Sequence, residues 1–516
     1  MSRRLRPDLE QRGPSPEGAA LFFDPITGRE LELSPEQIAI VRALEGEPTI
    51  EGAAEAAGRA LGVELPPDLV LELAAVLDEL GLLERAGDGA DRIRVRQREA
   101  RRRFFEEERL EKLKLALEKL SALPYYASVL PSPLPTLDHL DDLARLPRLD
   151  KATLRARFDA FLPRDLPPDV RWLSTSGTSG ERQQLARSEA DWDLAQTFTW
   201  TLNRAVRDVL GARYARLTTP VCDGTECHLS RASLEERTQG PRLALETTTG
   251  IASLPDEAVR RMVRELEDHA PEYFLADPSY LAMVVAQAER LRLRMPRVKL
   301  VVSSYELCSA LHRRRIEEAF ECPLFEAYGA SELGAMALQC EAGRLHVNPS
   351  SYVLEVLCRG QEAPGSVGRV VVTSLDKSIM PLLRYDTGDL AVRASGPCTC
   401  AWAETDTLER LCGRAVDVLS RTDGSLVTPA DVDARISAAA SRDVVSYALV
   451  QEEQAKYRAS LLSYAPCDLG PVRDALHDLL GPGASVRVER RRELLPAPSG
   501  KFRLSHAASA ALRPEV

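Results

Sequence analysis

The sequence has no apolar run that could cross a membrane. A membrane-spanning helix needs about 18 to 20 consecutive apolar residues, and no such run occurs in the 516 residues. The basic start of the chain, Met1-Ser2-Arg3-Arg4, is not followed by the apolar segment of a secretory signal. Both absences argue against a membrane or secreted protein and favour a cytoplasmic one.

Clustered cysteine and net positive charge are also missing. Ten cysteines spread over 516 residues do not make the dense framework of a disulfide-stabilised domain. The chain has 67 Lys and Arg against 78 Asp and Glu, and its net charge of −11 argues against broad nucleic-acid binding. We therefore expect reduced thiols and no nucleic-acid partner.

The remaining composition is typical of a globular protein with several domains. Hydrophobic residues make up 44% and charged residues 28% of a chain too long for one domain. Residues 1–14 are charged and contain Pro and Gly, so we expect a disordered leader there. Composition and pattern then predict an N-terminal domain over residues 15–90, a large domain over 91–412 and a small, mobile domain over 413–516.

The N-terminal domain has the pattern of a winged helix. Two strands around a Pro/Gly turn are expected over residues 21–33. Ser34-Pro35-Glu36-Gln37 carries the signature of a capping box at a helix start. Further helices over about 50–61 and 68–80 are expected to stop at glycines, and Leu82-Leu83-Glu84-Arg85 to form one arm of a short hairpin.

A winged helix more often binds DNA, but the charge of this one argues against it. Between Ser15 and Asp88 there are sixteen Asp and Glu against four Arg and no Lys, a balance that repels a phosphate backbone. Peptide docking by strand addition, or a purely structural role, remains. The order of elements resembles the PqqD-like domain, the precursor-peptide recognition element of ribosomal-peptide modification pathways. That resemblance implies a leader peptide as partner.

The rest of the chain predicts a long helix and then an α/β architecture. Residues 91–123 are charged but carry apolar faces, which indicates a packed linker helix. From Trp172 to Leu411 short apolar strands alternate with amphipathic helices, and Trp172-Leu173 ends what we expect to be a buried strand. Strands are also expected at 444–450 and 459–464 in a small α+β unit.

A loop of hydroxyls and glycines follows Trp172-Leu173. Glycine allows positive φ and close approach of the backbone, and clustered hydroxyl and N–H donors suit a polyphosphate. The alternative is a flexible Ser/Gly loop without a ligand. The candidate phosphate-binding residues are Thr175, Ser176, Gly177, Thr178, Ser179 and Gly180.

Four further motifs follow at long intervals, and each alone would be only a common turn or tail. They are Glu326-Ala327-Tyr328-Gly329-Ala330-Ser331-Glu332-Leu333-Gly334, Leu383-Arg384-Tyr385-Asp386-Thr387-Gly388-Asp389-Leu390, Gly413-Arg414-Ala415-Val416-Asp417-Val418-Leu419, and Leu494-Leu495-Pro496-Ala497-Pro498-Ser499-Gly500-Lys501-Phe502-Arg503. With the Ser/Gly loop they resemble the adenylate-forming superfamily, and within it the phenylacetate-CoA-ligase-like enzymes. The resemblance covers about residues 100–510.

The resemblance implies a role for each motif. Tyr328 lies near adenine, Ser331 contacts the α-phosphate, and Glu332 holds Mg²⁺, which prefers hard oxygen ligands. Asp389 accepts both ribose hydroxyls, Arg414 at the domain hinge contacts ribose or phosphate, and Lys501 reaches the carboxylate and the α-phosphate. The family's Gly-Lys-Pro after the phosphate loop is replaced here by Gly180-Glu181-Arg182.

The implied reaction is attack of a carboxylate on the α-phosphorus of ATP, which gives an acyl-AMP and pyrophosphate. Transfer to a second nucleophile follows, and coenzyme A is the common acceptor in the similar enzymes. One hypothesis places this chemistry in a peptide-tailoring pathway, and the alternative is a free-standing acyl- or aryl-CoA ligase. A third hypothesis, a silent binding module, rests on the missing loop lysine. By analogy with the family the chain could form a homodimer.

Two pairs of possible metal ligands follow two of these motifs. Cys340 and His346 follow the motif that contains Glu332, and Cys398 and Cys400 follow the motif that contains Asp389. Together they would make a closed tetrahedral Zn²⁺ site, as in some phenylacetate-CoA-ligase-like proteins, with a structural role. The alternative is four ordinary residues, since cysteine is often just a small core side chain.

The resemblance also implies residues that line the acyl pocket. By resemblance, the residues that could line it are Trp192, Trp200, Thr219, Tyr305 and Ala327. Cys222-Asp223-Gly224-Thr225-Glu226-Cys227 stands where an aryl ligase has a Gly-rich aromatic segment. We therefore do not expect phenylacetate itself to be the substrate.

Overall fold

The computed structural model describes residues 4–14, 19–24, 29–84, 90–168, 170–174, 183–219, 232–248, 250–359 and 365–514. The chain divides into two compact units, Met1–Glu108 with Pro397–Thr405, and Arg109–Gly396 with Asp406–Val516. Each unit is described on its own below. In the described part of the chain, every helix is too short or too polar to span a bilayer.

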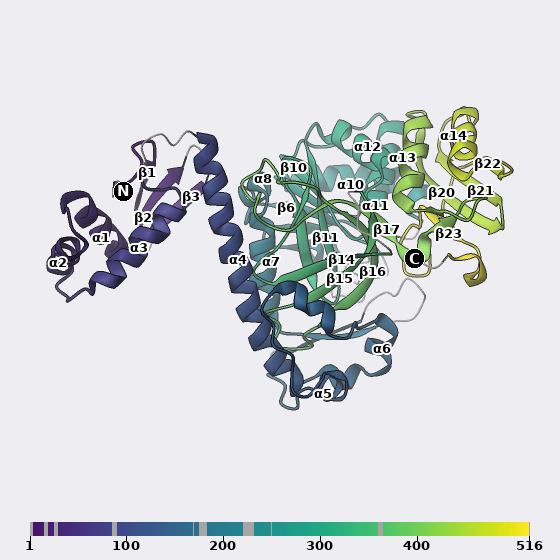
Figure 1. Ribbon diagram of the computed structural model, residues 1–516. Helices are drawn as coiled ribbons and strands as arrows, with labels where there is room; N and C mark the ends of the chain where they lie inside the picture. The colour runs from purple at the N-terminus through teal and green to yellow at the C-terminus, as the bar shows by residue number, and fades with distance from the viewer. Residues whose placement is uncertain are drawn as a thin grey trace. The chain divides into compact units, whose positions relative to one another are not determined.

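The first unit contains a small antiparallel sheet followed by three short helices and most of a long one (Figure 1). The strand order is β1-β2-β3, so β3 is an edge strand among the described residues. The elements are β1 (Glu10–Pro14), β2 (Ala20–Asp24), β3 (Arg29–Leu33), α1 (Pro35–Gly46), α2 (Ile50–Leu61), α3 (Pro67–Glu79) and α4 (Ala90–Ser121).

Local sequence signals explain where these helices begin and end. The Ser34 hydroxyl accepts the Gln37 N–H, and the Gln37 side chain accepts the Ser34 N–H, which confirms the predicted capping box. Helix α2 ends at Gly62, whose φ of 72° suits glycine. The predicted helices at about 50–61, 68–80 and 91–123 are confirmed within two residues at each end.

One expectation for this unit is wrong. Residues 4–14 are structured, because β1 pairs with β2 and the buried Arg6 guanidinium pairs with the buried Asp24 carboxylate. Leu83 forms an isolated bridge with Leu5, and the expected hairpin continues into residues 85–89, which lie outside the described residues. The charged N-terminal segment looks disordered from composition, because its strand partner and the partner of Arg6 lie further along the chain.

The second unit is built on a large mixed sheet, as the α/β pattern predicted. Its order is β14-β15-β16-β17-β13-β12-β11-β10-β9-β6-β8-β7. The strands β8, β6, β9, β10 and β11 run parallel, and the strands from β11 through β12, β13, β17, β16 and β15 to β14 pair antiparallel. Their bounds are β6 (Tyr214–Leu217), β7 (Thr238–Gln239), β8 (Arg242–Ala244), β9 (Tyr273–Ala276), β10 (Leu300–Ser303), β11 (Leu324–Ala330), β12 (Gly334–Gln339), β13 (Leu345–Val347), β14 (Tyr352–Cys358), β15 (Val367–Ser374), β16 (Tyr385–Arg393) and β17 (Thr407–Arg414).

Helices cover this sheet, and one of them is buried along almost its whole length. Every residue of α11 from Pro278 to Ala288 is buried, and the helix shares a core with buried residues of the C-terminal sheet such as Val445 and Leu462. The helices of this region are α5 (Pro124–Val129), α6 (Lys151–Ala156), α7 (Glu189–Thr201), α8 (Arg204–Arg207), α9 (Leu234–Arg237), α10 (Asp256–His269), α11 (Pro278–Arg290) and α12 (Ala310–Phe320). Short 3₁₀ turns occur at Leu140–Arg145, Phe158–Phe161, Ile251–Ser253 and Ala415–Asp417.

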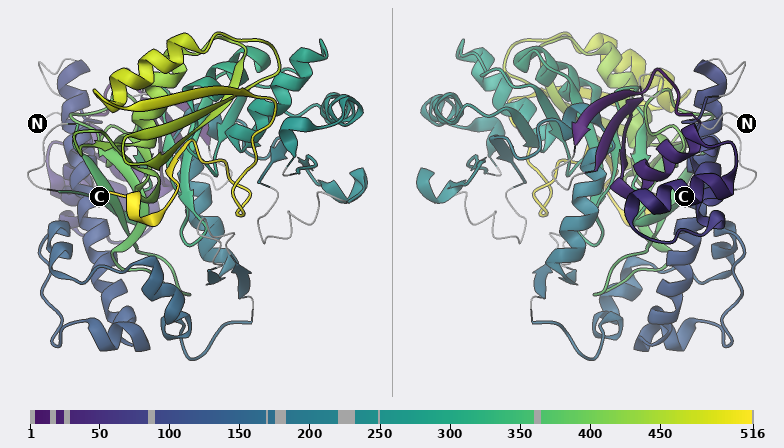
Figure 2. Two further views of the ribbon diagram at one scale, coloured as in Figure 1. Left: turned by 90° about the vertical axis from the view of Figure 1, so that its right-hand side faces the viewer. Right: turned by 90° about the vertical axis from the view of Figure 1, so that its left-hand side faces the viewer.

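The C-terminal part of this unit is a four-stranded sheet with two helices, α13 and α14, along it (Figure 2). Strand β20 contains the predicted strand 444–450, and β21 overlaps the predicted 459–464, so both are confirmed. The strand order is β22-β21-β20-β23. The bounds are α13 (Pro429–Ala439), β20 (Val444–Glu453), β21 (Lys456–Ser463), α14 (Gly470–Leu480), β22 (Ser485–Arg491) and β23 (Ser505–Ala507), preceded by the short pair β18 (Leu419–Ser420) and β19 (Leu426–Val427).

The strand expected before the Ser/Gly loop exists, but it is not buried. Strand β4 (Arg171–Ser174) pairs only with β5 (Gln184–Arg187). Trp172 is 57% exposed, so its expected burial is wrong. An apolar side chain predicts a core position only when a second layer covers it, and this two-stranded ribbon leaves that face open.

Candidate active site

The large sheet brings the second, third and fourth motifs together, although β13 and β12 lie between β17 and β11. Tyr328 lies on β11, Asp389 on β16, and Arg414 ends β17. Asp389 and Arg414 are direct partners in the β16–β17 pairing. Side chains from motifs that are far apart in the sequence therefore lie close together at one part of the sheet.

The side chains of these residues form one polar cluster. The buried Tyr328 hydroxyl donates to Asp389 Oδ2 at 3.0 Å, and Arg414 Nε lies 3.5 Å from Asp389 Oδ1. Burial raises the pKa of Tyr328, and the Asp389 charge adds to that rise. Tyr328 therefore stays a neutral donor that orients Asp389. Its expected place beside adenine stays a prediction.

The predicted Mg²⁺ ligand, Glu332, is buried among donors. Tyr385 donates its hydroxyl to Glu332 Oε1 at 2.8 Å, and Lys151 Nζ lies 3.5 Å from the same oxygen. Burial opposes ionisation, but the Lys151 charge and the hydrogen bonds together hold the pKa of Glu332 below its usual value. Glu332 is thus an anion that could bind a divalent cation, whereas Ser331 beside it is exposed.

Sequence reasoning assigned no role to Lys151, because only tertiary pairing brings it to the site. Asp150 caps the helix α6 that starts at Lys151. The Leu149 N–H donates to the Arg384 carbonyl at 3.0 Å, and the Asp386 N–H donates to the Leu149 carbonyl at 2.8 Å. These bonds fix the start of α6 beside β16, and nothing in the local sequence indicates that pairing.

Lys501 also lies at this site. Its Nζ donates to the Tyr305 carbonyl at 2.6 Å. Burial and then the like charge of Arg414 lower the pKa of Lys501, while the carboxylates of Glu306, Asp277 and Asp389 act in the opposite direction. The C-terminal loop therefore brings its lysine within electrostatic reach of both Asp389 and Arg414, as the proposed bridging role requires.

Gly413 in the hinge motif has a backbone conformation and a close contact that favour glycine. Gly413 has a φ of 93°, and a Cβ on it would come within 2.6 Å of the Pro429 ring. Only glycine satisfies both conditions without strain. Arg414 is the next residue, so the position of its side chain depends on this glycine.

The four predicted zinc ligands are brought together. The ligand atoms of Cys340, His346, Cys398 and Cys400 all lie within 4.8 Å of one another, and the first three residues are buried. Three thiols and one imidazole in a mostly buried group match the donor set of a structural Zn²⁺ site. The residues present therefore fit the metal that the sequence suggested.

The candidate phosphate loop, Thr175 to Gly180, and the atypical segment from Cys222 to Cys227 lie outside the described residues. Among the acyl-pocket candidates, Thr219 and Ala327 are buried, and Tyr305 contacts Lys501.

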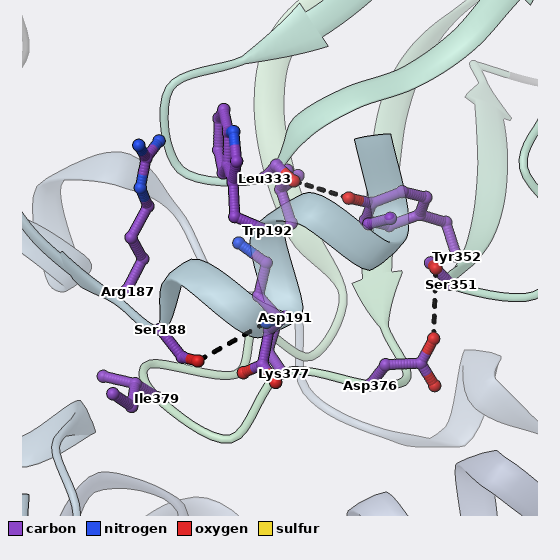
Figure 3. Close-up of a pocket in the computed structure, with 11 residues that line it drawn as sticks. Arg187, Ser188, Asp191, Trp192, Leu333, Ser351, Tyr352, Asp376, Lys377 and Ile379 are labelled. Atoms are coloured by element: carbon purple, nitrogen blue, oxygen red, sulfur yellow. Dashed lines mark hydrogen bonds between the residues drawn. The ribbon is translucent and has the colours of Figure 1, made fainter. Parts of the chain in front are cut away.

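A pocket beside Glu332 involves another of these candidates, Trp192 (Figure 3). The Arg187 guanidinium lies 3.8 Å from the centre of the Trp192 ring. Burial lowers the pKa of Lys377 to about 8, and its Nζ donates to the Glu332 carbonyl. The lining residues are Arg187, Ser188, Asp191, Trp192, Ala195, Leu333, Ser351, Tyr352, Asp376, Lys377 and Ile379.

Comparison with known proteins agrees with the motifs. No protein-family model matches the chain. The phenylacetate-coenzyme A ligase of Thermus thermophilus is 28% identical over 301 residues, which are 56% of this chain and 63% of that protein. The corresponding ligase of Pseudomonas putida is 24% identical over 265 residues, 49% of this chain and 57% of that protein. The chain thus matches less than two thirds of the length of either relative.

The fold has solved counterparts. A crystal structure of 2-hydroxyisobutyryl-CoA ligase in the postadenylation state aligns with a TM-score of 0.57 and 18% identity, over 77% of this chain and 86% of that one. At this identity the likeness shows the fold alone. The chain therefore has the fold of this CoA ligase and is similar in sequence to two phenylacetate-coenzyme A ligases.

Proposed function

We propose that this chain is an AMP-forming carboxylate ligase. The observation that carries the proposal is the convergence of Tyr328, Asp389 and Arg414 with Lys501, which come from four separate motifs. A fold kept only for binding would not need a lysine that is held on the Tyr305 carbonyl within electrostatic reach of Asp389 and Arg414. This argument weighs against the silent-module hypothesis.

In this proposal the substrate carboxylate is already an anion, so little acid–base catalysis is needed. A carboxylate oxygen attacks the α-phosphorus of ATP, the bond to the β-phosphate oxygen breaks, and pyrophosphate leaves. Lys501 stabilises the charge that builds on the α-phosphate. Glu332 would hold Mg²⁺, and the bound cation would supply positive charge against the phosphates. Lys151, 3.5 Å from Glu332, supplies a cation that the phosphate loop lacks.

The acceptor of the acyl group divides the two enzymatic hypotheses. The similarity to CoA ligases favours coenzyme A. The N-terminal unit favours a peptide-tailoring pathway, because β3 is an edge strand and α3 exposes Leu69, Leu71 and Val76. An edge strand can accept an added peptide strand, and exposed apolar side chains can contact a peptide.

ATP–pyrophosphate exchange across a panel of carboxylates tests the proposal. We expect exchange with at least one carboxylate, and a loss of at least about 100-fold in Lys501→Ala, because a removed charged group costs that order in transition-state stabilisation. The Lys456→Ala variant is a matched control, since its exposed side chain pairs only with Glu453. Absence of ATP binding and of exchange would refute the proposal.

The same assay, repeated with coenzyme A, separates the acceptors. AMP release that requires coenzyme A would favour the free-standing ligase. Exchange without any effect of coenzyme A, together with peptide binding by the N-terminal unit, would favour the tailoring pathway. A homodimer and a cytoplasmic location remain expectations from the sequence.

A further inference from the structure

The loop that carries Lys501 is held by one hydrogen bond at each of three consecutive residues. The Gly500 carbonyl accepts the Tyr280 hydroxyl at 2.7 Å. Lys501 Nζ donates to the Tyr305 carbonyl at 2.6 Å. The Phe502 N–H donates to Glu306 Oε1 at 2.7 Å. We call the three residues that hydrogen-bond to this loop, Tyr280, Tyr305 and Glu306, the lysine seat.

The lysine seat is braced from behind. The Ser279 hydroxyl donates to Glu306 Oε2 at 2.9 Å, so both oxygens of this carboxylate are engaged. Ser279 itself is fixed at the start of α11, where its N–H donates to Asp277 Oδ1 at 3.0 Å. Helix α11 is buried on all sides from Pro278 to Ala288. These contacts fix the Glu306 carboxylate independently of the Lys501 loop.

The backbone of the lysine seat is strained where it accepts the lysine. Tyr305 has a φ of 78°, which is unfavourable for a residue with a bulky side chain. Its hydroxyl accepts Arg216 Nε at 2.8 Å, and its carbonyl accepts Lys501. Strain of this kind persists only where surrounding contacts fix it, and it gathers at functional sites.

Charge and packing also favour the loop on this seat. Asp277 and Glu306 are carboxylates whose burial raises their pKa, Asp277 to about 7, and the Lys501 charge acts against both rises. Asp277 Oδ2 is buried and has no hydrogen-bond partner among the described residues. The Phe502 ring packs 5.2 Å from the Tyr280 ring. Removal of the loop would leave two buried carboxylates without their cation, which is unfavourable.

We propose that Tyr280 and Glu306 are positioning residues that seat Lys501 for the adenylation step. The proposal rests on the proposed function, and it adds two residues that do not touch substrate but decide where the lysine lies. Loop and seat come from segments about 200 residues apart in sequence, so the position of the lysine depends on tertiary contacts. Seat variants should impair acyl-AMP formation, because the seat places Lys501 for that step.

Tyr280→Phe is the sharpest variant, because it removes one hydroxyl and leaves the ring packing with Phe502. We expect the rate of ATP–pyrophosphate exchange to fall roughly 5- to 10-fold, the worth of one hydrogen bond, with no change in KM for ATP. Glu306→Ala should cost roughly 10- to 100-fold, and Glu306→Gln should recover part of this loss because its amide oxygen can accept the Phe502 N–H.

Tyr464→Phe is the matched control. Its hydroxyl donates to the Ala252 carbonyl at 2.8 Å, so it also links the C-terminal sheet to the rest of this unit, but it does not touch the Lys501 loop. We expect wild-type exchange from this variant. Equal losses in Tyr280→Phe and Tyr464→Phe would overturn the proposal, because general loosening would then explain both.

Tryptic cleavage after Lys501 gives a readout that does not depend on activity. The seated lysine is protected in the full-length protein, so Tyr280→Phe and Glu306→Ala should be cut there several-fold faster than wild type and Tyr464→Phe. Wild-type cleavage rates in both seat variants would overturn the proposal. If wild type shows no exchange with any carboxylate, the proposed function fails, and the cleavage rates still decide whether the seat exists.

Discussion

Asp389 shows how one residue depends on contacts that are far away in sequence. Its Oδ2 accepts the Tyr328 hydroxyl, and its Oδ1 faces Arg414. A carboxylate fixed by a neutral donor and a cation is a preorganised acceptor for a pair of ribose hydroxyls. The predicted role of Asp389 therefore has a physical basis in the structure, and it can be tested directly.

We expect Asp389→Asn to bind ATP roughly 10- to 100-fold more weakly, because the charge-assisted hydrogen bonds to the ribose hydroxyls are lost. Calorimetric titration with a non-hydrolysable ATP analogue measures this. Asp423→Asn removes the same charge from an exposed turn, where the carboxylate accepts only the Ser425 groups, and should bind like wild type. Unchanged affinity in Asp389→Asn would contradict the assignment.

The zinc ligands also belong to the residue scale. We expect about one Zn²⁺ per chain in the purified protein, measured by elemental analysis, since the donors match a closed structural site. Cys398→Ser should lose most of the metal and lower Tm, because a structural zinc contributes directly to folding. Cys467→Ser, outside the group, should keep both. Metal-free protein with unchanged Tm would argue for four ordinary residues.

At the scale of elements, the turn into the hinge limits which residues the chain accepts. We expect Gly413→Ala to lower the free energy of unfolding by roughly 2–4 kcal/mol, because it adds both a strained φ and a clash with Pro429. Gly424 also has a positive φ, of 83°, but its Cβ would meet nothing within 4 Å. Gly424→Ala should therefore cost only about 1 kcal/mol in the same denaturant titration. Equal costs would show that the contact with Pro429 is unimportant.

The contact of α12 with β20 gives a pH dependence. His312 on α12 is buried and faces the Ser446 hydroxyl at 3.1 Å, and burial lowers its pKa to about 4. The unfolded chain protonates the His312 imidazole near pH 6.5, whereas the folded chain keeps it neutral down to about pH 4. The contribution of neutral His312 to the free energy of unfolding is therefore complete above pH 6.5 and is lost as pH falls toward 4. Its size is on the order of 3 kcal/mol.

Denaturant titrations at pH 7, 5.5 and 4.5 test this contribution. We expect wild type to lose stability more steeply than His312→Gln, which cannot titrate but can still bond Ser446. His477→Gln, at an exposed position in the last turn of α14, should follow wild type. Parallel curves for wild type and His312→Gln would contradict the expected dependence.

At the scale of the whole molecule, the N-terminal unit and the adenylating fold should have separable functions. The unit is strongly acidic, so a peptide with basic residues would complement it. Exposed Leu69 and Val76 lie seven residues apart on α3, which puts them on one face of the helix.

We expect Leu69→Glu in the full-length chain to weaken binding of a fluorescent precursor peptide at least about 10-fold. The reason is that a charge would replace the apolar contact that Leu69 makes with the bound peptide. Exchange activity should stay at the wild-type level. Leu426→Glu, an equally exposed position on β19, should leave peptide binding unchanged. Equal peptide affinity in all three proteins would contradict docking at α3.

The sequence by itself determined what local physics controls. The capping box at Ser34, the helix end at Gly62 and the strand at 444–450 follow from side-chain hydrogen bonds, glycine conformations and short-range periodicity, and all three are present. Tyr328 and Asp389 are singled out by the resemblance of their motifs to the adenylate-forming superfamily, because each motif alone is only a common turn.

Only the tertiary structure decided what depends on distant partners. It placed Lys151 beside Glu332, set Lys501 on Tyr305, and left Trp172 exposed on a two-stranded ribbon. These outcomes depend on which strands pair and which layer covers a face. Such pairings join segments tens to hundreds of residues apart, and no local pattern of side chains encodes them.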